Sequence, residues 1–168
     1  KIITTWYSRR VINTLHNIVT PTKHLTFQQL KIYYEESGFD TRGEHFLDNL
    51  GFYTDQEKLN YVAFLMSDVN SVSIKVVKYS GTDKVDLISN DEYGYCCLIK
   101  ACLNVLNRLN IENITSAQIT SIKRKEKRLV DATAMREAVI NAIIHQDYIN
   151  GSYPVFEIYS DRMEITSS

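Results

Sequence analysis

Three polar residues, Glu137, Asn141 and His145, recur at every fourth position of the stretch REAVINAIIHQDY, among many alanines and isoleucines. On a helix, the carboxylate and the carboxamide are neighbours about one turn apart. Hydrolysis of a nucleotide uses such a pair. The carboxylate can orient or deprotonate the attacking water, and the amide oxygen can join the octahedral shell of a Mg²⁺ ion that bridges the phosphates. On this hypothesis Glu137 is catalytic and Asn141 is a metal ligand.

The same spacing has a simpler interpretation. At about 100° per residue, Glu137, Asn141, Ile144, His145 and Tyr148 fall within about one quarter of a helix circumference, opposite an alanine-rich side. Such a stripe is typical of the solvated face of an amphipathic helix. A histidine near the helix C-terminus would then interact with the negative end of the helix dipole. The pattern alone leaves both interpretations open.

A helix and a hairpin must position these residues. The helix is expected to begin at Asp131 or Thr133, because both residue types are good N-caps. Its buried side is predicted to consist of Met135, Ala138, Val139, Ala142 and Ile143. Residues 153–167 then alternate twice around Ser160 and Asp161, which predicts a β-hairpin with a turn at those two residues. The alternation assigns Phe156 and Ile158 to one face and Val155, Glu157 and Tyr159 to the other.

The preceding chain mixes helical and strand patterns without a repeating βαβ rhythm. Helices are expected over residues 26–37, 43–53, 58–68 and 93–109. Strands are expected over residues 71–81, 83–90 and 113–125. Thr26 is the expected N-cap of the first helix, and Gly38 is expected to stop it. This order favours an α+β fold, with a mixed or antiparallel sheet covered by helices.

Composition narrows the class of protein. The chain has 168 residues, 44% of them hydrophobic, which suits one globular domain or two small ones. A formal net charge of -1 gives no global attraction to nucleic acid or to an anionic membrane. The sequence has neither an apolar run of roughly 18 residues nor a signal-peptide pattern, so a cytoplasmic protein without a membrane span is expected. The chain also begins without Met and ends just after a strand pattern, which suggests a fragment.

The cysteines are not arranged like ligands or a disulfide framework. Cys96, Cys97 and Cys102 lie within one predicted helix, where neighbouring side chains point in different directions. The four histidines are scattered, and no CxxC or HxH pattern occurs. We therefore expect reduced, core-packed cysteines.

The C-terminal third of the chain resembles a known family. MREAVINAIIHQDY followed by VFEIYSDRMEITS resembles the divergent GHKL-type ATPase domain, related to histidine kinases and gyrase, of transcriptional regulators with a RecG-like C-terminal region. The upstream stretches WYSRR, LTFQQLKIYYEESG and SIKVVKYSGTDK resemble the middle of the same proteins. The resemblance implies the tail of an Alba-like, Schlafen-type DNA-binding domain over residues 1–40, a connecting α/β region over 41–112, and a truncated GHKL-like layer over 113–168.

The resemblance also implies cofactors and roles. ATP and Mg²⁺ would be the cofactors, with Glu137 as the water-activating carboxylate and Asn141 as the Mg²⁺ ligand. His145 and Asp147 match the end of the helix motif, and His145 is grouped with the nucleotide site. In GHKL proteins the adenine-binding turn and the glycine-rich lid come later, beyond Ser168. ATP binding by this chain is therefore expected to be weak or absent.

DNA contact is a separate question. Five basic residues fall within SIKRKEKR, which is enough for local phosphate contacts: Lys123, Arg124, Lys125, Lys127 and Arg128. Near the start, Trp6, Tyr7, Arg9 and Arg10 form an aromatic and basic cluster that could stack on bases or cover a core edge. The simpler interpretation of both groups is a solvated surface.

Three functions remain open from the sequence. The first is a DNA-binding transcriptional regulator whose ATPase-like domain senses nucleotide. The second is an active Mg²⁺-dependent ATPase in which Glu137 performs hydrolysis. The third is a non-catalytic scaffold that forms a homodimer. We take the regulator as the leading hypothesis because it accounts for both parts of the resemblance.

Overall fold

The computed structural model describes residues 15–119, 124–128 and 130–167, and over residues 114–128 it describes the backbone alone. The chain forms two compact units. Unit 1 runs to Ser71 and includes Tyr95–Lys100, and unit 2 holds Val72–Gly94 and the chain from Ala101 onward. The domain borders expected at residues 40 and 112 stay a prediction from the resemblance.

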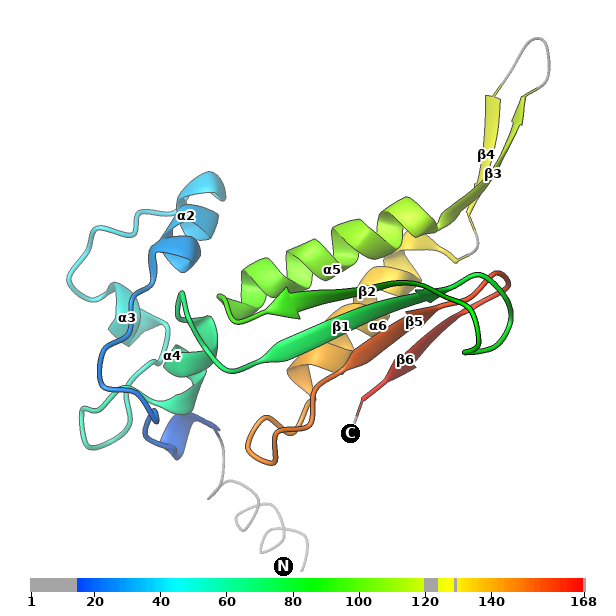
Figure 1. Ribbon diagram of the computed structural model, residues 1–168. Coiled ribbons are helices and arrows are strands. Elements are labelled where there is room, and N and C mark those ends of the chain that lie inside the picture. Colours follow the sequence, from blue (N-terminus) through cyan, green and yellow to red (C-terminus); the bar gives the residue numbers. More distant parts are fainter. Residues whose placement is uncertain (1–14, 120–123, 129, 168) are drawn as a thin grey trace, which may run out of the picture. The chain divides into compact units, whose positions relative to one another are not determined.

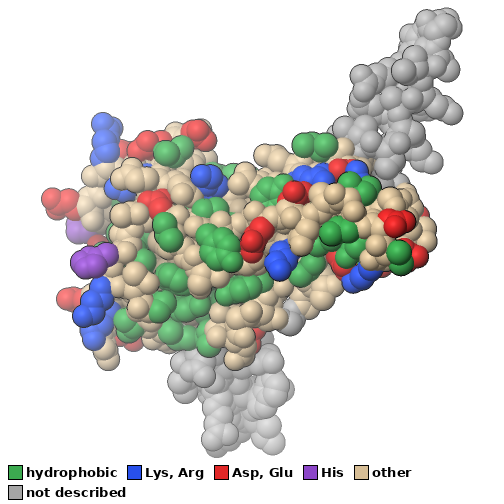
Figure 2. All heavy atoms as spheres, in the orientation of Figure 1, with side chains coloured by type: hydrophobic (Ala, Val, Ile, Leu, Met, Phe, Trp, Pro, Cys, Tyr) green, Lys and Arg blue, Asp and Glu red, His purple; other side chains and the backbone are tan. Residues whose placement is uncertain are grey.

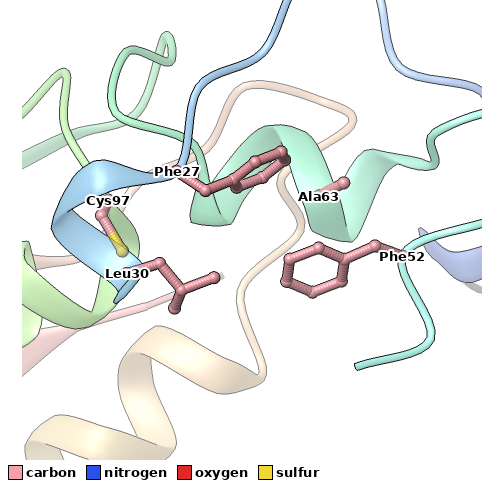
Figure 3. Packing of buried hydrophobic residues seen from close by; sticks show 5 residues of the cluster. All are labelled: Phe27, Leu30, Phe52, Ala63 and Cys97. Carbon is pink, nitrogen blue, oxygen red and sulfur yellow. The ribbon is translucent and has the colours of Figure 1, made fainter. Parts of the chain in front are cut away.

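Unit 1 is built from short helices around a small aromatic core. Its elements are η2 (Leu15–Asn17), α2 (Gln28–Glu36), α3 (Phe46–Asn49) and α4 (Tyr61–Met66). The core residues shown in Figure 3 are Phe27, Leu30, Phe52, Ala63 and Cys97. The rings of Phe27 and Phe52 lie 5.6 Å apart between centroids, so residues distant in sequence close this core. The three helices predicted in this part of the chain are confirmed.

Side chains from elsewhere in unit 1 fix the helix ends. The Asn60 side chain accepts a hydrogen bond from the Ala63 amide and donates one to the Gly51 carbonyl, at 3.0 and 2.7 Å. The N-cap expected from Thr26 was placed wrongly, because Phe27 occupies the cap position of α2 without a side-chain bond. The carboxylate of Asp68 instead accepts hydrogen bonds from the first amides of this helix. Gly38, at φ +86°, ends α2 as predicted.

Unit 2 contains a four-stranded mixed sheet. Its strands are β1 (Ser73–Tyr79), β2 (Leu87–Gly94), β5 (Val155–Ile158) and β6 (Met163–Thr166), in the order β2-β1-β5-β6. β1 is antiparallel to β2 and parallel to β5, and β5 is antiparallel to β6. Figure 1 shows α5 (Leu98–Glu112) and α6 (Ala132–Ile144) on the same side of this sheet. β3 (Ile114–Ile119) and β4 (Arg124–Arg128) form a separate antiparallel pair. The α+β class with a mixed sheet is confirmed.

The alternation of β1 explains how the sheet holds its helices. Ile74 and Val76 are fully buried, and Val76 lies beside Phe156 in the register between β1 and β5. Side chains at adjacent register positions share a face of the sheet, so these apolar residues form one buried layer. Val105 of α5 and Val139 of α6 are also fully buried. The core of unit 2 lies between that face and the two helices.

The segment between β1 and α5 corrects two sequence predictions. The strand expected over residues 83–90 lies at Leu87–Gly94, and the helix expected from Tyr93 begins at Leu98. β2 ends at Gly94, whose backbone lies close to the start of β1. A Cβ added at this position would stand 2.2 Å from the Val72 carbonyl oxygen, so glycine permits this close approach.

The cysteines consequently do not share a helix. Cys96 and Cys97 precede α5, and Cys102 lies within it. All three thiols are free, with Cys97 buried and the other two partly buried. Burial raises the pKa of each thiol above its ordinary value.

Candidate functional site

The start of α6 is fixed by one side chain. The Asp131 carboxylate accepts hydrogen bonds from the backbone amides of Thr133 and Ala134, at 2.9 and 3.0 Å. Of the two N-caps considered from the sequence, Asp131 is therefore the one used. Because the first helical residue is set, the face on which every later side chain of α6 lies is set as well.

One side of α6 packs into unit 2 much as predicted. Four of the five residues expected there are buried: Met135, Val139, Ala142 and Ile143. The prediction was wrong for Ala138, which is exposed. At about 100° per residue, Ala138 lies roughly 40° outside the arc that the four buried residues span. Periodicity identified the buried side but overestimated its width.

Glu137, Asn141 and His145 lie on the exposed side of α6. The helix ends at Ile144, and His145 is its C-cap residue. Within the described part of the chain, the side chains of Glu137 and Asn141 make no hydrogen bond or ion pair. No described residue therefore occupies their side-chain oxygen atoms, which can meet a ligand or water.

Tyr148 does not lie on the polar side of α6, although a spacing of about 100° per residue placed it there. The helix ends four residues earlier, and Tyr148 folds back to donate a hydrogen bond from its hydroxyl to the Ile143 carbonyl at 2.6 Å. Tyr148 is 3% exposed, and this burial raises its pKa above the ordinary value. The tyrosine of the HQDY segment thus provides a hydrogen-bond donor for a carbonyl at the C-terminal end of α6.

Asp147 gives the same segment a sharp turn. Its carboxylate accepts hydrogen bonds from the backbone amides of Ile149 and Asn150, both at 3.2 Å, and from the Asn150 side-chain amide. The Asn150 side chain is the main cause that holds the pKa of this carboxyl below its usual range. Asp147 is exposed but is not simply solvated, because it organises the turn that follows α6.

A largely apolar cavity of about 280 Å³ lies beside α6 within unit 2. Its walls come from the end of α5, from α6 and from the β5–β6 hairpin. The lining residues are Leu109, Val130, Ala134, Met135, Ala138, Phe156, Glu157, Met163, Glu164 and Ile165.

The polar pair flanks this cavity without lining it. Ala134 and Ala138 form the α6 part of the wall. On an ideal helix, Asn141 points within about 20° of Ala134, and Glu137 within about 60° of it. Helix geometry therefore brings the carboxylate and the amide alongside Ala134 and Ala138, on the exposed side of the helix. The expectation that the alanines lie opposite the polar stripe was wrong for these two residues.

On the face drawn in Figure 2, acidic and basic side chains of the described residues are interspersed among apolar and other polar ones. Over the same described residues, no group of three or more His, Cys, Asp or Glu side chains is placed to hold a metal ion.

The basic stretch falls on β4. Arg124, Lys125, Lys127 and Arg128 belong to this strand, whose register pairs Lys125 with Gln118 and Lys127 with Ser116. The strand expected over 113–125 is confirmed over β3. The prediction was wrong for Arg124 and Lys125, which belong to the antiparallel partner strand β4. Four further predicted contact residues and one of the lysines lie outside the described residues: Trp6, Tyr7, Arg9, Arg10 and Lys123.

None of the described helices combines the length and the apolar character that a membrane span needs.

No protein-family model and no curated protein matches the chain. Among solved structures, the chain is similar to the crystal structure of the DIP2311 protein from Corynebacterium diphtheriae, with a TM-score of 0.72 and 14% sequence identity. The similarity covers 96% of this chain and 35% of that one, so the chain spans about a third of that protein's length. At this identity the likeness shows the fold alone.

Proposed function

We propose that unit 2 belongs to a nucleotide-sensing, GHKL-type ATPase-like domain of a cytoplasmic, DNA-binding transcriptional regulator. One observation supports this proposal most directly. Glu137 and Asn141 lie about one turn apart on the exposed side of α6, beside an apolar cavity, and their side chains have no partner among the described residues. A carboxylate and a carboxamide in such a position suit a Mg²⁺-bound nucleotide.

Each residue has a separate role in this proposal. The amide oxygen of Asn141 would be a ligand of Mg²⁺, which usually keeps several waters and substrate phosphates and takes one or two protein oxygens. Bound MgATP would supply a polarised terminal phosphate. The Glu137 carboxylate would orient or deprotonate the water beside it. His145, the C-cap residue of α6, would lie at the far end of the same polar line.

The test is a thermal-shift titration with MgATP on the longer protein that the resemblance implies. A nucleotide that binds the folded state raises its stability by about 2.7 kcal/mol at 100 times its dissociation constant. We expect this protection to disappear in Asn141→Ala and to persist in Glu137→Gln. Ile144→Ala is the matched control, because Ile144 is 63% exposed on the same helix and has no ligand atoms. Protection that is equal in all four proteins would contradict the role of Asn141.

Turnover separates the sensor from the alternatives. ATP hydrolysis that Glu137→Gln abolishes would favour an active ATPase, whereas protection without hydrolysis would favour the sensor. If no nucleotide protects the longer protein, the scaffold hypothesis gains, and its concentration-dependent dimerisation becomes the property to measure.

DNA binding is proposed for β4. A two-stranded β-ribbon is one of the elements that fits the major groove, and β4 carries four basic residues opposite β3. We expect replacement of Lys125 and Lys127 by alanine to weaken binding to any duplex. Each lost phosphate contact should reduce the slope of log affinity against log salt by about 0.9. Lys75→Ala is the control, since Lys75 is an exposed lysine on β1. An unchanged salt slope in the double variant would exclude β4 as the contact.

A further inference from the structure

The connection between β1 and β2, residues 80–86, lies against the turn of the β5–β6 hairpin, and is here called the strap. In Figure 1 this connection runs beside that turn. The register pairs Val77 with Glu157, one position along from Val76 and Phe156. Because adjacent residues of a strand point to opposite faces, Glu157 belongs to the sheet face away from α5 and α6, the face that the strap approaches.

The strap supplies the cation for a buried carboxylate. The Lys84 ammonium lies 2.7 and 2.9 Å from the two carboxylate oxygens of Glu157. The Glu157 side chain is 7% exposed, whereas that of Lys84 is 62% exposed. A carboxylate at this depth is costly without a partner, and Lys84 is the cation that lies against it. The hydrogen bond that the Lys84 ammonium donates to the Glu157 carboxylate raises the pKa of Lys84.

Arg162 holds the strap from the hairpin side. Its guanidinium carbon lies 4.1 Å from the centroid of the Tyr159 ring, which stacks on Tyr79 at 5.2 Å. The same guanidinium donates a hydrogen bond to the Thr82 carbonyl at 3.0 Å. The Ser160 amide adds another, to the carbonyl of a strap glycine at 3.1 Å. The KYSGTDK and SDR segments, far apart in the sequence, therefore meet here.

The side chains of the strap itself bury little apolar surface in these contacts. Every residue from 82 to 88 is exposed. Val85 is 77% exposed, and Leu87 and Ile88 at the start of β2 are 57% and 56% exposed. A segment held by hydrogen bonds and an ion pair, without buried apolar side chains, belongs to the parts of a protein that open at low free energy.

We propose that the strap is a conformational device. It opens without unfolding of unit 2, and the charge of Lys84 keeps it closed. When closed, it fixes the outer face of the β5–β6 hairpin, whose inner face is a wall of the cavity beside α6. When open, it exposes Glu157 and the stacked tyrosines to water. The inference concerns the hairpin itself and does not depend on nucleotide binding.

Native-state hydrogen exchange of this chain tests the strap. The reporters are the amide of Ser160, which is bonded to Gly81, and the amide of Ser80, which is bonded to the Asp86 carbonyl at 2.9 Å. In Lys84→Met, which keeps the apolar stem and loses the charge, we expect both amides to exchange about tenfold faster. The buried α6 residue Val139 should keep its rate, and Lys75→Met is the control variant.

Two results would overturn the proposal. If Lys84→Met accelerates Val139 as much as Ser160, the strap opens only with the whole unit. If neither reporter changes, Lys84 does not hold the strap.

A second measurement needs no variant. Acetylation of the unaltered protein by acetic anhydride should modify Lys84 about tenfold more slowly than the exposed Lys75, because an ion-paired ammonium is a poor nucleophile. Equal rates for the two lysines would also overturn the proposal.

Discussion

The two sides of α6 differ in what explains them. On one side, Met135, Val139, Ala142 and Ile143 are buried against unit 2, and packing accounts for each. On the other side, Glu137 and Asn141 are exposed and have no partner in the described part of the chain. When packing does not explain a polar side chain, a ligand is one explanation of its chemistry. The following substitutions test this contrast.

The largest contrast is expected between two adjacent isoleucines. Ile143 is 3% exposed and Ile144 is 63% exposed. Ile143→Ala should lower the free energy of unfolding by about 3 kcal/mol, because it removes buried methyl groups and leaves a cavity. Ile144→Ala should change it by less than about 0.5 kcal/mol. Urea denaturation followed by circular dichroism measures both. Similar losses in the two variants would mean that α6 has no exposed side.

The next effect concerns the closure of α6 by Tyr148. Tyr148→Phe should cost about 1 kcal/mol at neutral pH, because the Ile143 carbonyl loses its hydrogen bond. Thermal unfolding at pH 7 gives this value. A cost near zero would indicate that the hydroxyl does not contribute to the helix end.

Alkaline pH should reduce that difference. Burial raises the pKa of Tyr148 in the folded state above the value of about 10 in the unfolded chain. The stability that Tyr148 contributes is therefore fully present below pH 10, and it falls by about 1.4 kcal/mol per pH unit above it until the folded pKa is reached. The phenylalanine variant lacks this dependence. Its deficit relative to the unaltered protein should shrink between pH 10 and 11.

The sequence predicted what depends on local periodicity. Each successful prediction describes one element. The alternation of Ile74 and Val76 indicated a strand, and Asp131 indicated the start of a helix. The alternation on both sides of Ser160 and Asp161 indicated a hairpin. The helices, strands and α+β class that they imply are confirmed. The identities of Glu137 and Asn141 also indicated an exposed polar line, but the role of that line remains a prediction.

The failures have a common physical cause, which is contact between residues distant in sequence. Asp68 caps α2 from 40 residues away, and Lys84 pairs with Glu157 across 73 residues. Periodicity carries no information about such partners. Tyr148 was misplaced for a related reason, since a helical angle has no meaning beyond the last helical residue. The sequence showed Lys84 in the GTDK segment and Glu157 between apolar strand residues, but pairing them required the fold.

A smaller effect is expected at the start of α6. Asp131→Ala should lower the free energy of unfolding by about 1 kcal/mol, because two first-turn amides lose their acceptor. Thr133→Ala is the control, since Thr133 contributes only its backbone amide to the cap. Chemical denaturation of both variants would sharpen the comparison. An equal loss from Thr133→Ala would mean that the cap is shared.

The smallest effect is the one that bears most directly on function. Glu137→Gln should leave the free energy of unfolding within about 0.5 kcal/mol, because the side chain is exposed and unpaired within the described chain. Asn141→Ala should even stabilise by a few tenths of a kcal/mol, since alanine has the higher helix propensity. A loss above about 1 kcal/mol in either variant would show that the fold uses this side of α6. The polar character of these two residues would then need no ligand to explain it. In Asn141→Ala, an unchanged free energy of unfolding together with loss of MgATP protection would show that one side of α6 serves folding and the other serves binding.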